Sequence, residues 1–272
     1  MAALEYRPTS IKSRLISAIS RRLDFITYTQ RHGLIAGLKR RGGLGFLPTW
    51  LVGDTTDTPE LRFLAGLDVR GMVVYDVGAF YGLITLHFAR HAKTVVSYEP
   101  TPFSRERVRQ NVALNGFTNV ILRDVGVGSE PGELEFVVDR RKAGTATSDT
   151  ALQRQYEKTN DKLERVRAAI VRLDDEVASG KVPPPDVVKI DTEGAELGVL
   201  RGMTNVLASY RPALYLEMHG ADDADKRARV AAIVAFLMQH GYADIRHIES
   251  GAAVTEANAA VAREGHLFAR AR

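Results

Sequence analysis

The chain has 272 residues, of which 45% are hydrophobic and 26% are charged, a composition typical of a soluble globular protein with one large core. It contains no cysteine, which excludes disulfides, thiolate catalysis and cysteine-ligated metal centres and is consistent with a reducing cytoplasm. No run of 18 apolar residues and no signal-peptide pattern occurs, so we expect neither a transmembrane helix nor a signal peptide.

The basic charge is concentrated at the N-terminus. Residues 1–50 carry nine Lys/Arg against two acids, a net charge of +7 in a chain whose total is +4, so the remaining 222 residues sum to −3. Apolar residues recur every three or four positions over residues 11–26, which predicts an amphipathic basic helix. We predict a helical extension over residues 1–60 and one large domain over residues 61–272.

Two roles of this extension stay open. Residues 1–45 either pack on the core or on a second copy of the chain, or lie on an anionic membrane surface. A nucleic-acid site is not expected, because no aromatic residues are interleaved with the charge. We therefore expect a cytoplasmic protein, with or without contact to a membrane.

The most informative stretch is Val73–Pro100, in which two apolar strands flank a helix. A β-branched run ends at Gly78, helical spacing follows from Leu83, and the second apolar strand ends at Glu99. This is a βαβ unit, and such units bind ligands at the carboxyl ends of their strands.

The residues at these strand ends favour an adenosine-containing cofactor. Glu99 follows Asp76 by 23 residues, at a strand tip where a carboxylate accepts hydrogen bonds from both ribose hydroxyls. Gly78 and Gly82 allow a sharp turn and a close approach of the backbone to a ligand. The turn lacks the G-x-G-x-x-G glycines that cradle a pyrophosphate, which Asp76 would also repel, whereas Asp76 suits the ammonium of a methionine moiety. S-adenosylmethionine is therefore favoured over a nicotinamide dinucleotide.

The chain continues as an alternation of helices and strands. A helix over 103–115 and a strand over 120–122 place Asp124 where a carboxylate would accept the adenine amino group, although an ordinary turn acid would look the same. Residues 125–138 predict a hairpin-like addition. Residues 139–165 are polar and poorly patterned and form an insertion above the crevice, either a substrate lid or a surface loop.

Polar residues gather again where later strands end. A strand over residues 166–173 is followed by a second informative strand that ends at Asp191. Lys189 lies on the same face of this strand as Asp191, and a buried lysine needs an acidic partner. The next apolar strand ends with Glu217 and His219 on one face, and two C-terminal strands give a total of seven with an antiparallel end.

These motifs together resemble a known family. They are Asp76-Val77-Gly78-Ala79, Glu99-Pro100, Asn111 through Asn115-Gly116, Leu173-Asp174-Asp175, Lys189-Ile190-Asp191-Thr192-Glu193-Gly194-Ala195-Glu196 with Leu200 and Gly202, and Glu217 with His219. The chain is similar over roughly residues 70–245 to the FkbM family of S-adenosylmethionine-dependent methyltransferases. The resemblance implies an α/β, Rossmann-like class I methyltransferase fold, a mostly parallel sheet of strand order 3-2-1-4-5-7-6 flanked by helices. It also implies O-methylation of a hydroxyl on a sugar, glycolipid or macrolide-type natural product.

The resemblance and the strand-end residues give a predicted site. We expect S-adenosylmethionine to contact residues of the turns and strand ends: Asp76, Gly78, Ala79, Phe80, Gly82, Glu99, Pro100, Asp124 and Asp191. An alcohol does not ionise at neutral pH, so a base should take its proton as the new bond forms. We expect His219 to be this base, oriented by Glu217, while Asp191 places the cofactor amino group or the acceptor hydroxyl and is the second candidate for the base.

Three alternatives stay open. Asp191, Glu217 and His219 could instead hold a divalent metal ion, but no ligand spacing within one element supports this, and no metal is predicted. A nicotinamide-dependent oxidoreductase lacks its pyrophosphate glycines. A non-catalytic cofactor-binding scaffold would recruit partners or membrane through residues 1–45 and would need no base at the crevice.

Overall fold

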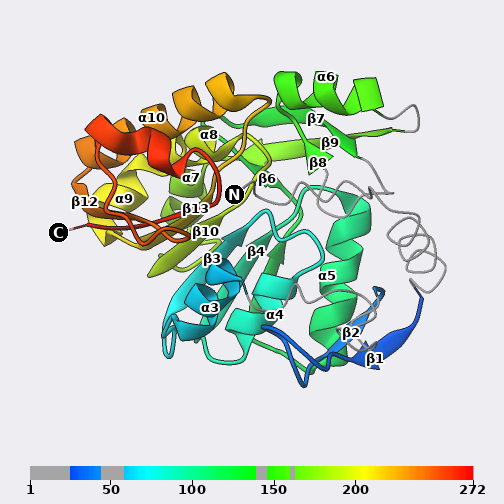
Figure 1. Ribbon diagram of the computed structural model, residues 1–272. Coiled ribbons are helices and arrows are strands. Elements are labelled where there is room, and N and C mark those ends of the chain that lie inside the picture. The colour runs from blue at the N-terminus through cyan, green and yellow to red at the C-terminus, as the bar shows by residue number, and fades with distance from the viewer. Residues whose placement is uncertain (1–24, 44–57, 139–145, 160–162, 272) are drawn as a thin grey trace.

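Figure 1 shows the computed structural model, which describes residues 25–43, 58–138, 146–159 and 163–271. The predicted basic helix over residues 11–26 lies almost entirely outside these residues. The described part of the extension is a hairpin rather than a helix, in which β1 (Thr27–Thr29) pairs with antiparallel β2 (Lys39–Arg41).

The hairpin is fixed to helix α5 (Pro102–Leu114). The backbone N–H groups of Lys39 and Arg41 donate to the side-chain oxygens of Asn115 and Asn111, each over 2.8 Å. Residues 25–43 therefore pack on the large domain, against its helix α5. No helix among the described residues is long and apolar enough to span a bilayer.

The centre of the molecule is a seven-stranded sheet. All neighbouring pairs are parallel except those of β13, which is antiparallel to both of its neighbours. From one edge to the other, the strands are β5 (Val120–Arg123), β4 (Thr94–Tyr98), β3 (Val73–Val77), β10 (Val187–Ile190), β11 (Ala213–Glu217), β13 (His266–Ala271) and β12 (Tyr242–His247). When the seven strands are numbered 1 to 7 by their order along the chain, their order across the sheet is 3-2-1-4-5-7-6. The predicted fold class is therefore confirmed.

Helices cover both faces of the sheet (Figure 1). Because side chains alternate along a strand, Tyr75 and Val77 of β3 enter the core with α8, α9 and α10, while Val74 packs with α3 and α4 on the other face. The helix bounds are α3 (Pro59–Gly66), α4 (Leu83–Ala89), α7 (Leu173–Ala178), α8 (Glu196–Arg201), α9 (Thr204–Tyr210) and α10 (Asp223–Gln239), with the 3-10 helix η1 (Glu256–Ala262) near the C-terminus.

A smaller four-stranded sheet lies beside the carboxyl ends of the parallel strands of the large sheet. Its order is β6 (Gly126–Val127), β9 (Glu164–Val171), β7 (Gly132–Val138) and β8 (Ala146–Thr147), and helix α6 (Thr150–Thr159) follows β8. The hairpin expected over residues 125–138 is wrong, because β6 and β7 each pair with β9 and not with each other. The strand predicted over residues 166–173 is confirmed as β9, but it ends at Val171, and Leu173 already begins α7.

Candidate active site

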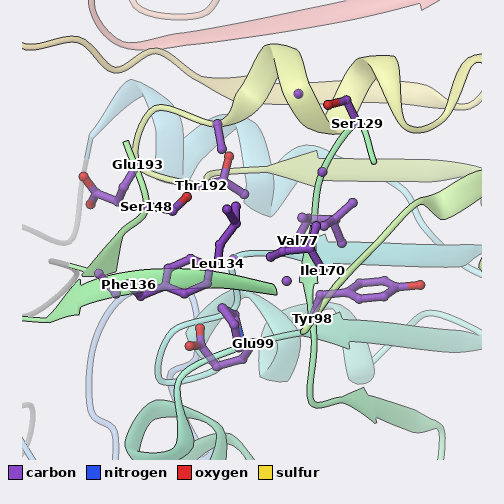
Figure 2. Close-up of a pocket in the computed structure, with 18 of the residues that line it drawn as sticks. Val77, Tyr98, Glu99, Ser129, Leu134, Phe136, Ser148, Ile170, Thr192 and Glu193 are labelled. Carbon is purple, nitrogen blue, oxygen red and sulfur yellow. The ribbon is translucent and has the colours of Figure 1, made fainter. Parts of the chain in front are cut away.

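A cavity of about 660 Å³ lies at the carboxyl ends of β3, β4, β10 and β11 and is bounded on its other side by the smaller sheet (Figure 2). Leu134, Phe136 and Ile170 of the smaller sheet give it an apolar wall. The charged residues that line it are all acidic within the described part of the chain: Glu99, Glu130, Glu133, Asp191, Glu193 and Glu217. The cavity therefore carries a negative potential that favours neutral or cationic groups.

The turn after β3 has no room for a side chain at Gly78. Its φ is +82°, and a Cβ there would lie 1.7 Å from the carbonyl oxygen of Asp191. The backbone after β3 therefore lies directly against that after β10, and Gly78 lines the cavity there. Ala79 and Gly82 do not line it, because Ala79 is buried and Gly82 begins α4 against Val108. The predicted cofactor contacts of Ala79 and Gly82 therefore have no place at the cavity wall.

Glu99 is held at the cavity wall by three donors. Its Oε1 accepts from the backbone N–H and the hydroxyl of Thr101, at 2.9 and 2.5 Å, and its Oε2 accepts from the N–H of Phe80 at 2.8 Å. Burial raises the pKa of Glu99 to about 7, although these donors and the charge of Lys189 oppose the rise. Phe80 has φ +50°, a strained value for a side chain of this size, and such strain is typical of functional sites.

Asp76 does not face the cavity. Its side chain is fully buried, accepts from the hydroxyl of Thr85 at 2.6 Å and lies 3.2 Å from the ammonium of Lys189. The position of Asp76 along the strand explains this, because Asp76 lies in register with Ser97 and Lys189 inside the sheet. The cavity-lining residues Gly78, Glu99 and Asp191 each lie two positions further along, beyond the strand ends. The structure therefore does not support a contact between Asp76 and the cofactor ammonium, and Asp76 instead holds Lys189.

Lys189 is paired as the sequence required. Its ammonium lies 3.2 Å from both Asp76 and Asp191 and donates to the carbonyl oxygen of Gly78 at 2.9 Å. Burial would lower the pKa of Lys189, but the charges of Asp191 and Asp76 outweigh it and raise the pKa. The lysine thus ties the glycine turn to the end of β10.

Asp124 lies away from the site. It is exposed beyond the end of β5 and does not line the cavity, so the structure does not support an adenine contact through its side chain. Arg123, the last residue of β5, forms a bidentate pair with Glu176 of α7, at 2.7 and 3.1 Å. Pro100 does line the cavity, as predicted.

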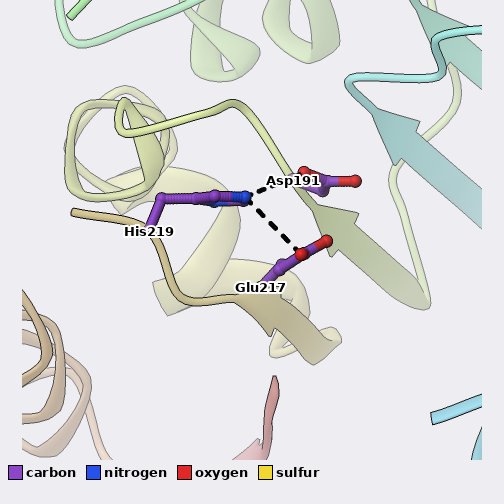
Figure 3. Close-up of side chains that lie close together, drawn as sticks. All are labelled: Asp191, Glu217 and His219. Atoms are coloured by element: carbon purple, nitrogen blue, oxygen red, sulfur yellow. Dashed lines mark ion pairs between the residues drawn. The ribbon is translucent and has the colours of Figure 1, made fainter. Parts of the chain in front are cut away.

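Asp191, Glu217 and His219 come together as the sequence predicted (Figure 3). His219 Nε2 lies 3.8 Å from Asp191 Oδ1 and 3.5 Å from Glu217 Oε1, and Glu193 Oε2 is also 3.8 Å away. The three groups meet because the parallel strands β10 and β11 end side by side. Asp191, Glu193 and Glu217 line the cavity, and the imidazole of His219, which is not itself a lining residue, lies beside these three carboxylates.

The residue that orients His219 is Glu196, not Glu217. Glu196 Oε1 lies 3.0 Å from His219 Nδ1 and also accepts from the N–H groups of Thr192 and Gly194. Burial alone would lower the pKa of His219, but the bond to Glu196 and the charges of Glu196, Glu193 and Glu217 hold this pKa well above its ordinary value. His219 is therefore a proton donor near neutral pH, and the prediction that it is the base is not supported.

Glu217 has its own partner on the neighbouring strand. His266 of β13 is opposite Glu217 in the sheet register, and its Nε2 lies 3.6 Å from Glu217 Oε2. His266 Nδ1 is in turn 2.6 Å from Glu249 Oε1. Burial opposes protonation, but Glu217 and Glu249 raise the pKa of His266 to about 10.

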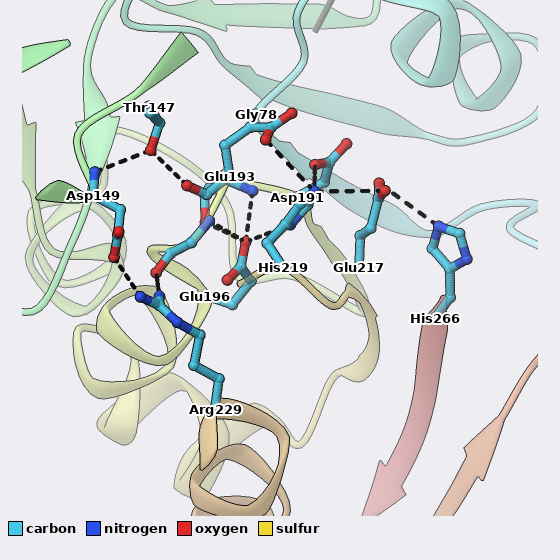
Figure 4. Close-up of polar contacts among 12 residues, drawn as sticks. Gly78, Thr147, Asp149, Asp191, Glu193, Glu196, Glu217, His219, Arg229 and His266 are labelled. Carbon is cyan, nitrogen blue, oxygen red and sulfur yellow. Dashed lines mark hydrogen bonds and ion pairs between the residues drawn. The ribbon is translucent and has the colours of Figure 1, made fainter. Parts of the chain in front are cut away.

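The insertion is tied to the loop after β10 (Figure 4). The hydroxyl of Thr147 donates to the carbonyl oxygen of Glu193 at 2.6 Å, and Arg229 of α10 donates to the carbonyl oxygen of Gly194 and to Asp149, each at 2.7 Å. Glu193 has φ +50°, a left-handed conformation that these bonds stabilise. None of these contacts was predicted from the sequence.

The sheet order and the strand-end cavity together define a class I methyltransferase. Residues 76–243 match the Methyltransferase FkbM domain, and the chain belongs to this family of methyltransferases.

Curated relatives agree with this assignment. The hexuronic acid methyltransferase AglP of Haloferax volcanii is 32% identical over 178 residues, which cover 65% of this chain and 69% of that protein. The 31-O-demethyl-FK506 methyltransferase FkbM of Streptomyces tacrolimicus is 26% identical over 232 residues, which cover 76% of this chain and 86% of that protein.

A solved structure, methyltransferase FkbM from Methylobacillus flagellatus KT, superimposes with a TM-score of 0.45 at 14% identity. The match covers 74% of this chain and 43% of that one.

Proposed function

We propose that the protein uses S-adenosylmethionine to methylate a hydroxyl group of a sugar, glycolipid or macrolide-type natural product. The observation that carries this proposal is the pairing of two polar ends in one cavity. Glu99 offers a carboxylate to a ribose at one end, and the cluster of Asp191, Glu217 and His219 offers groups that bind and deprotonate a hydroxyl at the other.

Glu99 supports the cofactor part of the proposal. Its three internal donors fix both oxygens, yet a carboxylate has about four acceptor positions and so can still receive a ribose hydroxyl. Gly78 brings bare backbone to the same wall. The negative cavity also suits S-adenosylmethionine, which carries a sulfonium and an ammonium against one carboxylate.

The reaction follows from the groups at the other end. An acceptor hydroxyl that receives a hydrogen bond from the His219 imidazolium is oriented toward the cofactor, and a neighbouring carboxylate takes its proton as the oxygen attacks the methyl carbon. The carbon–sulfur bond breaks as the oxygen–carbon bond forms, and the sulfur keeps the electron pair. The cofactor supplies the electrophile, while the protein aligns the groups.

The cavity also favours one kind of acceptor. The apolar wall of Leu134, Phe136 and Ile170 suits the apolar face of a sugar ring or a macrolide. Six acidic side chains line the cavity, and no lysine or arginine does so within the described residues, which disfavours an acceptor that carries a carboxylate or phosphate. We therefore expect neutral glycosides and macrolides to react better than hexuronates.

Two assays on the purified full chain test the proposal. S-adenosylmethionine, S-adenosylhomocysteine and NAD are compared first by thermal shift. A ligand at 100 times its dissociation constant adds about 2.7 kcal/mol, enough to raise the melting temperature by several degrees. Transfer of labelled methyl groups to neutral glycosides, a glycolipid, a macrolide and a hexuronate is then measured.

We expect a shift with the two adenosyl sulfur compounds and transfer to a neutral hydroxyl. A shift with NAD alone would overturn the proposal. Cofactor binding without transfer to any acceptor would favour the scaffold alternative.

A further inference from the structure

The cluster of Asp191, Glu217 and His219 has the composition and spacing of a cation site. One atom from each of the three side chains lies within 4.8 Å of the other two. The atoms are Asp191 Oδ1, Glu217 Oε1 and His219 Nε2, and they face one another across 3.5 and 3.8 Å. These separations are too long for hydrogen bonds, so the three atoms converge without being bonded to one another.

Each of the three groups is held from behind by a different partner (Figure 4). Asp191 Oδ2 lies 3.2 Å from the ammonium of Lys189. His219 Nδ1 is bonded to Glu196, which leaves Nε2 directed at the cluster. Histidines that bind metals almost always donate their second ring N–H to a carboxylate or carbonyl, and such outer partners orient the ligand atoms.

The third outer partner, His266, is itself incompletely satisfied. It is 7% exposed, and its Nε2 has no hydrogen-bond partner within the described part of the chain, although it lies 3.6 Å from Glu217 Oε2 and 3.7 Å from Glu60 Oε1. The carboxylate of Glu217 is therefore too far from His266 Nε2 for a hydrogen bond. A cation that drew Oε1 toward the cluster would fix the carboxylate between two positive partners.

We propose that Asp191, Glu217 and His219 bind one divalent cation through Oδ1, Oε1 and Nε2, and that the cation displaces to solvent the Nε2 proton that the imidazolium otherwise carries, since a metal-bound histidine is neutral. Two carboxylate oxygens and one imidazole nitrogen suit Mn²⁺ or Zn²⁺ better than Ca²⁺, which takes oxygen ligands only. Two carboxylates from neighbouring strand ends also repel each other, and a dication between them removes this repulsion.

The cation would act on the acceptor, and this role rests on the proposed methyl transfer. A hydroxyl oxygen that completes the coordination becomes more acidic. Its proton passes to the carboxylate of Glu193, which lines the cavity beside His219, as the oxygen bonds to the methyl carbon and the sulfur keeps the electron pair of the broken bond. Binding of the cation itself does not depend on this role.

Calorimetric titration of the chelator-treated full chain with MnCl₂, and then with ZnCl₂, tests the site. We expect saturable binding at one site, weakened at least about 10-fold in both His219→Ala and Glu217→Gln. The outer-partner variant Glu196→Gln should weaken it by about 10–100-fold. Asp124→Asn, which removes an exposed acid away from the cavity, should bind as the wild type does.

Absence of saturable binding up to about millimolar cation, or equal affinity in the wild type, His219→Ala and Glu217→Gln, would overturn the site. Titration with S-adenosylhomocysteine on the same preparations separates the two proposals, because the proposed function fails if that ligand does not bind, whatever Mn²⁺ does. Full methyl transfer after exhaustive chelation would overturn the role of the cation and leave the methyltransferase assignment intact.

Discussion

The two polar ends of the cavity are built in different ways. Glu99 takes its donors from Phe80 and Thr101, which belong to the same βαβ unit and lie within 19 residues of it. The cluster at the other end draws on β10, β11, α8 and β13, and its outermost member, His266, is 75 residues from Asp191. The first end is local in sequence, and the second depends on the whole sheet.

Under the proposed function, this difference separates the two substrates. A cofactor that is the same for many acceptors can be bound by one compact unit, whereas a site that activates a particular hydroxyl needs groups whose positions are set by several elements. Substitutions at the two ends should therefore separate cofactor affinity from turnover. A substitution at Gly78, where the backbones after β3 and β10 meet, should instead lower the stability of the fold.

The largest effect is expected where these backbones meet, in Gly78→Ala. A Cβ there would collide with the Asp191 carbonyl at 1.7 Å, so we expect the free energy of unfolding to fall by about 3–5 kcal/mol. Gly71→Ala is the matched control, since Gly71 has φ +74° but no atom within 4 Å, and should lose only about 1–2 kcal/mol. Denaturant unfolding measures both, and equal losses would contradict the steric argument.

At the acceptor end, His219→Ala should lower kcat by about 10²–10⁴-fold, because the hydroxyl loses the group that orients it. Affinity for S-adenosylhomocysteine should change by less than about threefold. His240→Ala is the matched control and should keep full turnover, because the His240 ring lies against Phe236 at the end of α10, outside the cavity lining. A loss of kcat below about tenfold in His219→Ala would refute the role.

At the cofactor end, Glu99→Gln should weaken S-adenosylhomocysteine binding by about 10–100-fold, the usual worth of hydrogen bonds to a charged group. Burial raises the pKa of Glu99 to about 7, and protonation would take up the acceptor position that remains for a ribose hydroxyl. Affinity should therefore rise as the pH increases through 7 in the wild type, and this dependence should be absent in Glu99→Gln.

The same pKa fixes the sign of a stability effect. The folded protein binds the proton of Glu99 more tightly than the unfolded chain, so the contribution of this group to stability is present below pH 4.5 and is lost as the pH rises through about 7. Thermal melting from pH 4.5 to 8 should show this loss in the wild type and not in Glu99→Gln. An opposite slope would mean that Glu99 is ionised throughout.

A smaller effect is expected from Arg229→Ala, which unties the insertion from the loop after β10. Arg229 bonds Asp149, Asp225 and the Gly194 carbonyl, so we expect a loss of about 1–3 kcal/mol and a higher KM for the acceptor. Arg227→Ala removes only an exposed pair with Asp223 and should cost about 0.3–0.5 kcal/mol. Unchanged KM in Arg229→Ala would show that this clamp does not shape the acceptor site.

Much of the large sheet could be predicted because its signals are local. A few residues are enough to predict each of its first elements: the valine run of β3, the glycine turn and the strand that ends at Glu99. The smaller sheet could not be predicted in the same way. The seven residue pairs of β7 and β9 join segments separated by the insertion. The sequence pattern of neither strand predicts that it pairs with the other.

The site shows the same limit. The sequence indicates Asp191, Glu217 and His219 because each lies at the end of an apolar strand. Glu196 and His266 give no such signal, since Glu196 begins α8 and His266 begins β13. The prediction for Asp76 fails because this residue lies inside β3, in register with Lys189, whereas Glu99 and Asp191 lie beyond the ends of their strands. An acid near a strand end reaches the cavity only if it lies beyond the last paired residue.

The most direct test of this two-ended cavity is calorimetric titration of S-adenosylhomocysteine into the wild type, Glu99→Gln and His219→Ala at pH 8. We predict that Glu99→Gln alone loses affinity, by about 10–100-fold, and that His219→Ala binds as the wild type does. Equal binding by Glu99→Gln and the wild type, or a loss confined to His219→Ala, would contradict the placement of the cofactor at the Glu99 end.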